Sequence, residues 1–430
     1  MNKARTEVLP CGLRVILVPC EAESAAAGVF VANGSRWESA KEAGVSHFIE
    51  HMLFKGTPTR KPADITRAIE GRGGNFNAFT GEESTCYYAH VPGEYLGEAV
   101  EILGDMYSNA SLDAVEFERE KRVVIEEIKM YSDEPDAVAM ENLQRNVFPG
   151  CPLGRPVAGS AASLEPMTPD SMRDYMRRHY RADNTLLVIA GAFDERDALG
   201  VAEKAFSWKA SPKGAKRPFV PVDFGRRTVP ESIVEKDVNQ TQIALGYRTF
   251  GIGDARKYAM GVLDAVLGRG MSSRLFMEVR EKRGLGYDIS SQMHFFRDAG
   301  LFTVAMGTDP AKASRALATI DRTLAAVREK KVGARELSRV KEFLTGNFRI
   351  SHENVKSKMF FYGSTWLSFG RLIPPSEQVE GIKSVTADEI LAVAKAVFRP
   401  ENRSLSLVVP EGAQSRKSRA GSNAAPAFRN

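Results

Sequence analysis

The segment GVSHFIEHMLFKGT contains two histidines at a spacing that suits a metal ion. His47 and His51 are four residues apart, so on a helix both imidazoles project from one face and can reach the same ion. Glu50 directly precedes the second histidine, close enough to contact a metal-bound water without being a ligand. This pattern predicts a Zn²⁺ site on a helix, with a carboxylate beside the metal.

Such a site would have a defined hydrolytic chemistry. Two neutral imidazoles and one carboxylate leave Zn²⁺ with a net positive charge and one open position, which lowers the pKa of a bound water to about 7 and polarises a carbonyl. Glu50 could then take the proton of this water and pass it to a leaving amine. The alternative is that His47 and His51 are solvent-facing histidines beside an acidic residue.

Two features of the chain favour the metal site over that alternative. The chain has only six histidines, and two of them fall at this spacing. The segment around them is also apolar enough to be mostly buried, where unpaired histidine and glutamate side chains would be costly. Its apolar residues are Val45, Phe48, Ile49, Met52, Leu53 and Phe54.

The elements that must position these residues are short apolar runs mixed with longer helical patterns. Because strands and helices do not alternate strictly, an α+β fold is favoured over a doubly wound sheet. Strands are expected at residues 12–19, 28–35, 84–92 and 184–193, and helices around Ala43–Phe54, Ala63–Glu70, Leu96–Asn109 and Asp113–Met130.

The chain also contains a repeat with a period near half its length. Leu164–Ile189 aligns without gaps on Ile382–Leu407, at an offset of 218 residues. Each copy begins with a threonine helix cap, runs through a helix into an Arg-x-acid-Asn turn, and ends in an apolar strand. Phe117–Met130 aligns on Leu337–Ile350 at an offset of 220 residues. A period this long predicts two homologous domains rather than a solenoid.

The predicted boundary between the two domains lies near residue 215. The join, SWKASPKGAKRPFVPVDF, is rich in Pro, Lys and Gly, as expected of a linker. We expect residues 1–214 to form a catalytic zinc-binding domain and residues 215–412 an inactive homologous domain that contributes substrate contacts. Residues 413–430 lack apolar periodicity and are predicted to be a disordered tail.

The composition is that of an ordinary globular protein, with 43% hydrophobic and 26% charged residues. A net charge of +5 is small for 430 residues, and the basic stretches lack interleaved aromatics, so no nucleic-acid partner is expected. Four scattered cysteines indicate free thiols in a reducing compartment. No run approaches the ~18 apolar residues that span a bilayer, and residues 1–19 predict a strand rather than a signal peptide. We therefore expect no membrane association and a cytoplasmic location.

The HxxEH pattern is the inverzincin motif, and HFIEHMLFKGT closely resembles the signature of the pitrilysin/insulinase metallopeptidases. Other segments are similar to that family in the same order: NAFTGEESTCYYAHV to its substrate-pairing strand, EREKRVVIEEI to its third-ligand helix, PLGRPVAGS to the loop that follows, and MSSRLFMEVREKRGLGY to its C-terminal-domain motif. Together these segments extend over most of residues 10–410. The resemblance implies two homologous α+β domains, each a mostly antiparallel sheet packed with helices.

The resemblance also implies the rest of the metal site. In this family the third ligand is a glutamate downstream of HxxEH, with a second glutamate two helical turns before it. Glu127 matches the ligand, and Glu120, seven residues earlier on the same helix face, matches the residue that orients a ligand histidine. Glu126 is adjacent and stays an alternative ligand, although on an ideal helix it would point about 100° away.

The internal repeat gives information on the metal ligands that does not depend on the family resemblance. At the offset of 220 residues, Glu127 falls on Asn347 and Glu120 on Val340, and the second half has no HxxEH. One half has therefore kept a metal site and the other has not, so one Zn²⁺ per chain is expected.

Substrate contacts are implied by the resemblance alone. Arg280 and Tyr287, seven residues apart, match the family's Arg/Tyr pair, whose guanidinium and hydroxyl can donate hydrogen bonds to an oxyanion or to substrate carbonyls. Arg283 is nearer to Tyr287 but does not match the family position. Asn77 and Ala78 match the strand edge that pairs with the peptide backbone.

At 430 residues, the chain resembles members of the short branch of the family. That branch includes the mitochondrial processing peptidase subunits and their bacterial relatives. Members of that branch pair two chains around a chamber, so a homodimer or a heterodimer with a related subunit is expected. The predicted function is a zinc-dependent endopeptidase acting on unfolded peptides or short protein segments. The alternatives are a non-catalytic structural or regulatory subunit of the same fold, and an unrelated metal hydrolase. The complete set of His47, Glu50, His51 and Glu127 favours the enzyme.

Overall fold

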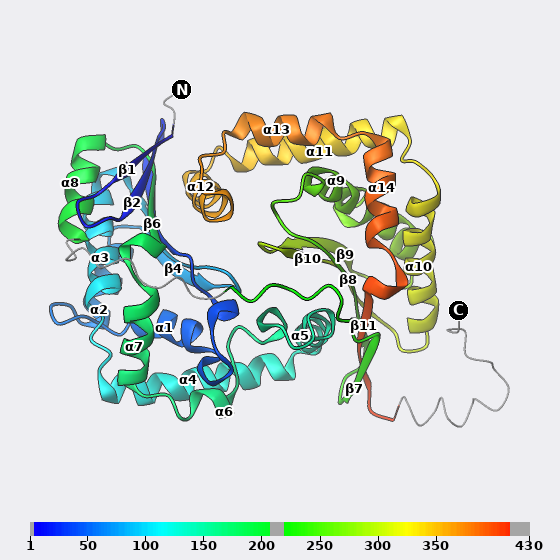
Figure 1. Cartoon of the computed structure of the whole chain (residues 1–430), viewed down its shortest axis with the longest axis horizontal. Helices are drawn as coiled ribbons and strands as arrows, with labels where there is room; N and C mark the ends of the chain where they lie inside the picture. Colours follow the sequence, from blue (N-terminus) through cyan, green and yellow to red (C-terminus); the bar gives the residue numbers. More distant parts are fainter. Residues whose placement is uncertain (1–3, 207–218, 413–430) are drawn as a thin grey trace. The chain divides into compact units, whose positions relative to one another are not determined.

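A computed structural model describes residues 4–206 and 219–412 (Figure 1). The first part of the predicted linker, residues 207–218, and the predicted tail, residues 413–430, lie outside the described residues. The chain divides into two compact units. The first comprises Met1–Lys129, Arg155–Val220 and Thr345–Val379, and the second comprises Met130–Gly154, Pro221–Leu344 and Glu380–Asn430.

The first unit contains a six-stranded sheet with the order β1-β2-β6-β3-β5-β4. Neighbouring strands are antiparallel except for β2 and β6, which are parallel. The strand bounds are β1 (Arg5–Val8), β2 (Arg14–Pro19), β3 (Ser24–Val31), β4 (Asn75–Thr80), β5 (Thr85–Pro92) and β6 (Thr185–Gly191).

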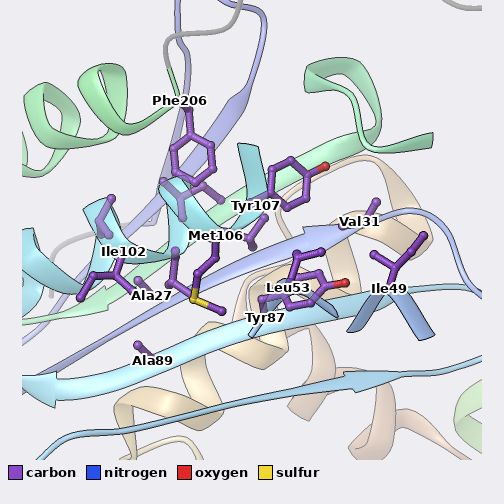
Figure 2. Close-up of a cluster of buried hydrophobic side chains, with 14 of the residues drawn as sticks. Ala27, Val31, Ile49, Leu53, Tyr87, Ala89, Ile102, Met106, Tyr107 and Phe206 are labelled. Carbon is purple, nitrogen blue, oxygen red and sulfur yellow. The ribbon is translucent and has the colours of Figure 1, made fainter. Parts of the chain in front are cut away.

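Helices cover both faces of this sheet, and successive side chains of its strands alternate between the two faces. In β3, Ala27 and Val29 join the larger core beneath α1, α3, α4, α7 and α8, whereas Phe30 packs on the opposite face with Met359 of α12. Figure 2 shows side chains of the larger core, among them Ile49 and Leu53 of α1. The helices of this unit are α1 (Val45–Leu53), α2 (Pro62–Glu70), α3 (Leu96–Asn109), α6 (Ala161–Leu164), α7 (Pro169–His179), α8 (Glu195–Ala205), α12 (Val355–Phe369) and most of α4 (Ala114–Asp133).

The second unit contains a five-stranded sheet with the order β7-β11-β8-β10-β9. Only β7 and β11 are parallel. The strand bounds are β7 (Glu231–Lys236), β8 (Thr241–Phe250), β9 (Ile289–Phe295), β10 (Ala299–Thr308) and β11 (Arg403–Pro410). Its helices include α5 (Pro135–Val147), α9 (Lys257–Gly268), α10 (Ala313–Glu329), α14 (Ala387–Val397) and parts of α11 (Ala334–Ser351) and α13 (Pro375–Ser384).

The two sheets repeat one topology, since β2-β6-β3-β5-β4 corresponds strand for strand to β7-β11-β8-β10-β9. The repeated segments found in the sequence form equivalent elements: α7 and β6 in one copy, α14 and β11 in the other. Both helices begin with a capping box, built by Thr168 and Ser171 in α7 and by Thr386 and Glu389 in α14. The predicted α+β class with two mostly antiparallel sheets is confirmed.

The compact units differ from a simple division of the chain near residue 215, because each half places one helix in the unit of the other half. Helix α5, from the first half, packs on β8 and β11, and helix α12, from the second half, packs on β2, β3 and β6. In α5 the buried residues Ala139, Leu143 and Val147 join the core beneath those strands. The copies of the repeat are consecutive in sequence, whereas the packing units interleave at residues 130–154 and 345–379.

Helix length and polarity bear on the predicted lack of membrane association. Within residues 4–206 and 219–412, every helix is too short or too polar to cross a bilayer. The cytoplasmic location stays a prediction.

Candidate metal centre

Helix α1 places the HxxEH side chains on one face and its apolar side chains on the other. Val45, Phe48, Ile49, Met52 and Leu53 are buried, a spacing that forms one apolar stripe along a helix. His47, Glu50 and His51 follow the same i, i+3, i+4 spacing on the remaining face, where they are only partly buried. The sequence pattern that forms the helix therefore also sets the orientation of the three polar groups.

The start of α1 is held by a buried carboxylate. Glu38 accepts hydrogen bonds from the backbone N–H groups of Gly44 and Ser46, each at 2.8 Å. Gly44 has a φ of +91°, a left-handed conformation that glycine adopts without strain. Burial raises the pKa of Glu38 to about 7, against the lowering effect of the two backbone hydrogen bonds. These contacts fix the first turn of α1, which contains His47, the first candidate ligand.

The candidate ligand atoms of His47, His51 and Glu127 all lie within 4.8 Å of one another. The Oε2 atom of Glu127 lies 3.3 Å from Nε2 of His51 and 3.8 Å from Nε2 of His47. Zn²⁺ takes nitrogen and oxygen ligands at about 2.0–2.2 Å, so ligand atoms around one ion lie roughly 3–4 Å apart. Both Glu127 distances fall in this range, and two imidazoles with one carboxylate are a ligand set that holds zinc with one position left for water or substrate.

The first of these histidines is held in the neutral form that a metal requires. Burial of its side chain, together with the neighbouring imidazole of His51, lowers the pKa of His47 to about 4. At neutral pH one of the two ring nitrogens of His47 therefore has a lone pair available for a metal ion.

Glu120 and Lys55 support the second histidine. Nδ1 of His51 lies 2.9 Å from Oε1 of Glu120, and the ammonium of Lys55 lies 2.7 Å from Oε2 of the same carboxylate. When Nδ1–H donates to Glu120, the lone pair of Nε2 points to the metal position. Burial opposes the ionised form of Glu120, but the hydrogen bonds from His51 and Lys55 outweigh it and hold its pKa below the usual value.

On helix α4 the two adjacent glutamates that the sequence left as alternative ligands point in different directions. The side chain of Glu127 points to the histidines, whereas the side chain of Glu126 is 70% exposed and forms an ion pair with Lys129 at 2.7 Å. The rotation of about 100° between successive residues of a helix accounts for this difference. The structure thus groups Glu127, and not Glu126, with the histidines.

Glu50 lies beside this group with one carboxylate oxygen engaged. The hydroxyl of Thr80, the last residue of β4, donates to Oε2 of Glu50 at 2.5 Å. Burial raises the pKa of Glu50 above its usual value, and the hydrogen bond from Thr80 offsets only part of this rise. The carboxyl group is therefore a better proton acceptor than an exposed glutamate. Neither Thr80 nor Lys55 was recognised from the sequence as part of the site.

Asn77 and Ala78 lie in the edge strand of the first sheet. Strand β4 is the last strand in the sheet order and pairs with β5 on one side. The side chain of Asn77 is exposed and its Oδ1 accepts the backbone N–H of Ala78 at 2.8 Å. An edge strand offers unpaired backbone groups to which an extended peptide can add.

Arg280 and Tyr287 lie together in the second unit. The guanidinium of Arg280 is 4.4 Å from the centre of the Tyr287 ring, and Tyr287 is 81% exposed. Arg280 belongs to a π-helical segment, Phe276–Glu281. Both side chains line a cavity of about 250 Å³, whereas Arg283 forms an ion pair with Glu278.

Comparisons with family models and with known sequences place these residues in context. Residues 14–161 match the model described as insulinase (peptidase family M16), and residues 166–344 match the model of the peptidase M16 inactive domain. An uncharacterized zinc protease of Bacillus subtilis, YmxG, is 34% identical over 93% of this chain and 97% of its own length. A second uncharacterized zinc protease, from Rickettsia felis, is 35% identical over 87% of this chain and 90% of its own length.

Solved structures share the fold at low sequence identity. A protease from Helicobacter pylori is 20% identical, with a TM-score of 0.88, over 95% of this chain and 99% of that chain. A peptidase M16 inactive domain from Pseudomonas fluorescens is 19% identical, with a TM-score of 0.85, over 95% of this chain and 98% of that chain.

Proposed function

The chain belongs to the insulinase family of peptidases, family M16, and from this membership we propose that it is a zinc-dependent endopeptidase acting on unfolded peptides or short protein segments. The zinc protease names of its relatives support a zinc peptidase. The observation that carries the proposal is the convergence of the ligand atoms of His47, His51 and Glu127 beside the carboxylate of Glu50.

Each of these groups has a role in peptide hydrolysis. His47, His51 and Glu127 would hold the ion, and zinc bound there would supply the positive charge that polarises the scissile carbonyl and makes water more acidic. Glu50 accepts the proton of the attacking water and returns it to the leaving amine. Glu120 holds the imidazole of His51 in the tautomer that leaves Nε2 available.

Peptide binding is assigned to the edge strand β4. Backbone groups around Asn77 and Ala78 would pair with an extended peptide, which fixes the peptide largely without regard to its sequence. An extended peptide can pair in this way only if its own backbone is free of secondary structure. Unfolded segments are therefore the proposed substrates.

The endopeptidase assignment is tested with a peptide that has no free ends. An unfolded peptide, acetylated at its N-terminus and amidated at its C-terminus, should be cut at internal bonds, and mass spectrometry of the products identifies these bonds. Products that lack only single terminal residues, or cleavage confined to peptides with free ends, would indicate an exopeptidase. Absence of cleavage in zinc-loaded protein would favour a non-catalytic subunit of the same fold.

We also propose that the enzyme is a dimer in which Arg280 and Tyr287 act in trans. In the short branch that the chain resembles, two chains together supply the four domains around one chamber. The second unit of a partner chain would then place Arg280 and Tyr287 opposite the metal, where they donate hydrogen bonds to the substrate. The partner is a second copy of this chain or a related subunit.

Mixing two inactive variants tests action in trans. Glu50→Gln and Tyr287→Phe, each weakly active alone, should rescue one another, because a mixed dimer carries both lesions in one of its two active sites and none in the other. In a random mixture about half of the dimers are mixed, so peptide cleavage should recover to about a quarter of the wild-type specific activity. Native mass spectrometry verifies subunit exchange. Activity no higher than the average of the two variants, despite exchange, would mean that Tyr287 acts in cis or not at all.

A further inference from the structure

The contact between Thr80 and Glu50 joins the edge strand to the acidic residue of the motif. The Thr80 hydroxyl donates to Oε2 of Glu50 at 2.5 Å, a length typical of a strong hydrogen bond to a carboxylate. Among the described residues, no group donates to the other oxygen, Oε1. One oxygen of the carboxylate is therefore held, and the other is available to take a proton.

The end of β4 that carries Thr80 is fixed by its surroundings. Thr80 pairs with Thr85 across the hairpin, and the hydroxyl of Thr85, itself fully buried, donates to the carbonyl of Asn33 at 2.9 Å. A residue outside the hairpin also contacts its turn, since the backbone N–H of Ser35 donates to the carbonyl of Gly81 at 3.2 Å. The Thr80 hydroxyl is thus presented from an end of the strand that strand pairing and hydrogen bonds hold in place.

The strand makes a second contact at Phe54, the residue that directly follows α1. Phe76, Ala78 and Thr80 are the partly buried residues of β4, while the residues between them are exposed. The ring of Phe76 packs on Phe54, with 5.0 Å between ring centres. Phe54 directly follows α1 and keeps helical backbone angles, so it lies on the same side as Glu50, four residues earlier. Strand β4 therefore has a defined position relative to the carboxylate of Glu50.

We propose that Thr80 is a positioning residue: its hydroxyl fixes the rotation of the Glu50 carboxylate and thereby aligns the base with a peptide bound along β4. This inference rests on the proposed peptidase function. Thr80 touches neither the metal group nor a reacting atom in this assignment. Its effect passes entirely through Glu50, whose carboxylate would otherwise rotate between orientations that cannot accept the proton.

Thr80→Val tests the proposal because valine keeps the shape and the strand preference of threonine and removes the hydroxyl. The kcat for peptide cleavage should fall about tenfold or more, the effect of losing one hydrogen bond to a charged group. KM and zinc content should stay at their wild-type values, since the backbone of β4 and the ligands are unchanged. Thr80→Ser, which restores the hydroxyl, should recover most of the kcat.

Thr66→Val is the matched control. Thr66 lies in α2, and within the described part of the chain its hydroxyl donates to the carbonyl of Pro62 in the same helix, at 3.2 Å. This variant should match the wild type in kcat, KM and zinc content. Thr80→Ala removes the same hydroxyl as Thr80→Val with a smaller side chain, and its kcat should fall by a similar factor.

A second measurement does not depend on activity. In metal-free protein, the thermal unfolding midpoints of Thr80→Val, Glu50→Ala and the double variant form a cycle that isolates the contact. If the hydrogen bond exists, the shift of the double variant differs clearly from the sum of the two single shifts. Additive shifts would overturn the proposal, even if Thr80→Val loses activity.

The outcomes separate this inference from the proposed function. Wild-type protein that cleaves no peptide would contradict the function, whereas the unfolding cycle would still report the contact. Active wild type with an unchanged kcat in Thr80→Val would overturn the role of Thr80 and leave the function intact. An equal loss of kcat in Thr80→Val and Thr80→Ser would also overturn it, because the hydroxyl would then not be the cause.

Discussion

Glu50→Gln should retain zinc and peptide binding and lose nearly all turnover. The amide has almost the shape of the carboxylate but cannot accept a proton from water, and general-base catalysis typically contributes about 10²–10⁴-fold in rate. Zinc binding should survive because His47, His51 and Glu127, not Glu50, form the group of side chains that could hold a metal ion. Cleavage of a quenched peptide and the metal content of the same preparation are the two measurements.

The matched control for this variant is Glu70→Gln. Glu70 ends α2 with an exposed side chain, so the same chemical change there should leave the rate unchanged. Glu50 would not be the base if its variant kept more than about a tenth of the wild-type activity. Loss of zinc in Glu50→Gln would instead indicate that Glu50 supports the metal.

Glu127→Gln should lower the affinity for zinc by more than about 100-fold, because even changes to groups behind the ligands commonly cost 10–100-fold. An amide oxygen carries no charge to offset that of the ion, and the candidate ligands that remain are His47 and His51. Competition with a chromogenic chelator measures the affinity, and the peptide-cleavage rate should fall with zinc occupancy.

Glu126→Gln is the comparison that gives this result its meaning. The two glutamates are neighbours in sequence, yet Glu126 is exposed and paired with Lys129. Its variant should bind zinc as the wild type does. The reverse result, with zinc lost from Glu126→Gln and retained by Glu127→Gln, would assign the third ligand to Glu126.

Much of the metal centre could be predicted from the sequence because it depends on helical periodicity. The spacing of His47 and His51 places both on one face of α1. Glu127 and Glu120 on α4 were implied by the family resemblance, with which their seven-residue spacing on one helix face agrees. Distance along the chain left Glu126 open as a ligand. The orientation of α4 against α1, which comes from packing, groups Glu127 and not Glu126 with the histidines.

The contacts of Thr80 and Lys55 could not be predicted in the same way. Each depends on how an element that carries no ligand pattern meets α1 or α4: the hairpin end of β4 in one case, the residues after α1 in the other. A threonine at the end of a strand and a lysine after a helix are common on protein surfaces. The only signal was the position of Thr80 in the NAFT segment, which the resemblance assigned to peptide pairing.

The interleaving of the two compact units could not be predicted from the sequence repeat either. The alignment of Leu164–Ile189 on Ile382–Leu407 identified equivalent elements, and the matching sheet orders agree with it. It could not show that α5 and α12 pack on the sheets of opposite halves. Both helices have buried apolar residues, and the pattern of such residues does not specify which sheet covers them.

Zinc titration of metal-free protein, followed by cleavage of a peptide blocked at both ends, tests the central claim most directly. Activity should rise in proportion to added zinc and reach a plateau at one zinc per chain, while Glu50→Gln binds the same amount and stays inactive. A plateau at two zinc ions per chain, cleavage by the metal-free protein, or no cleavage at any zinc concentration would contradict the account.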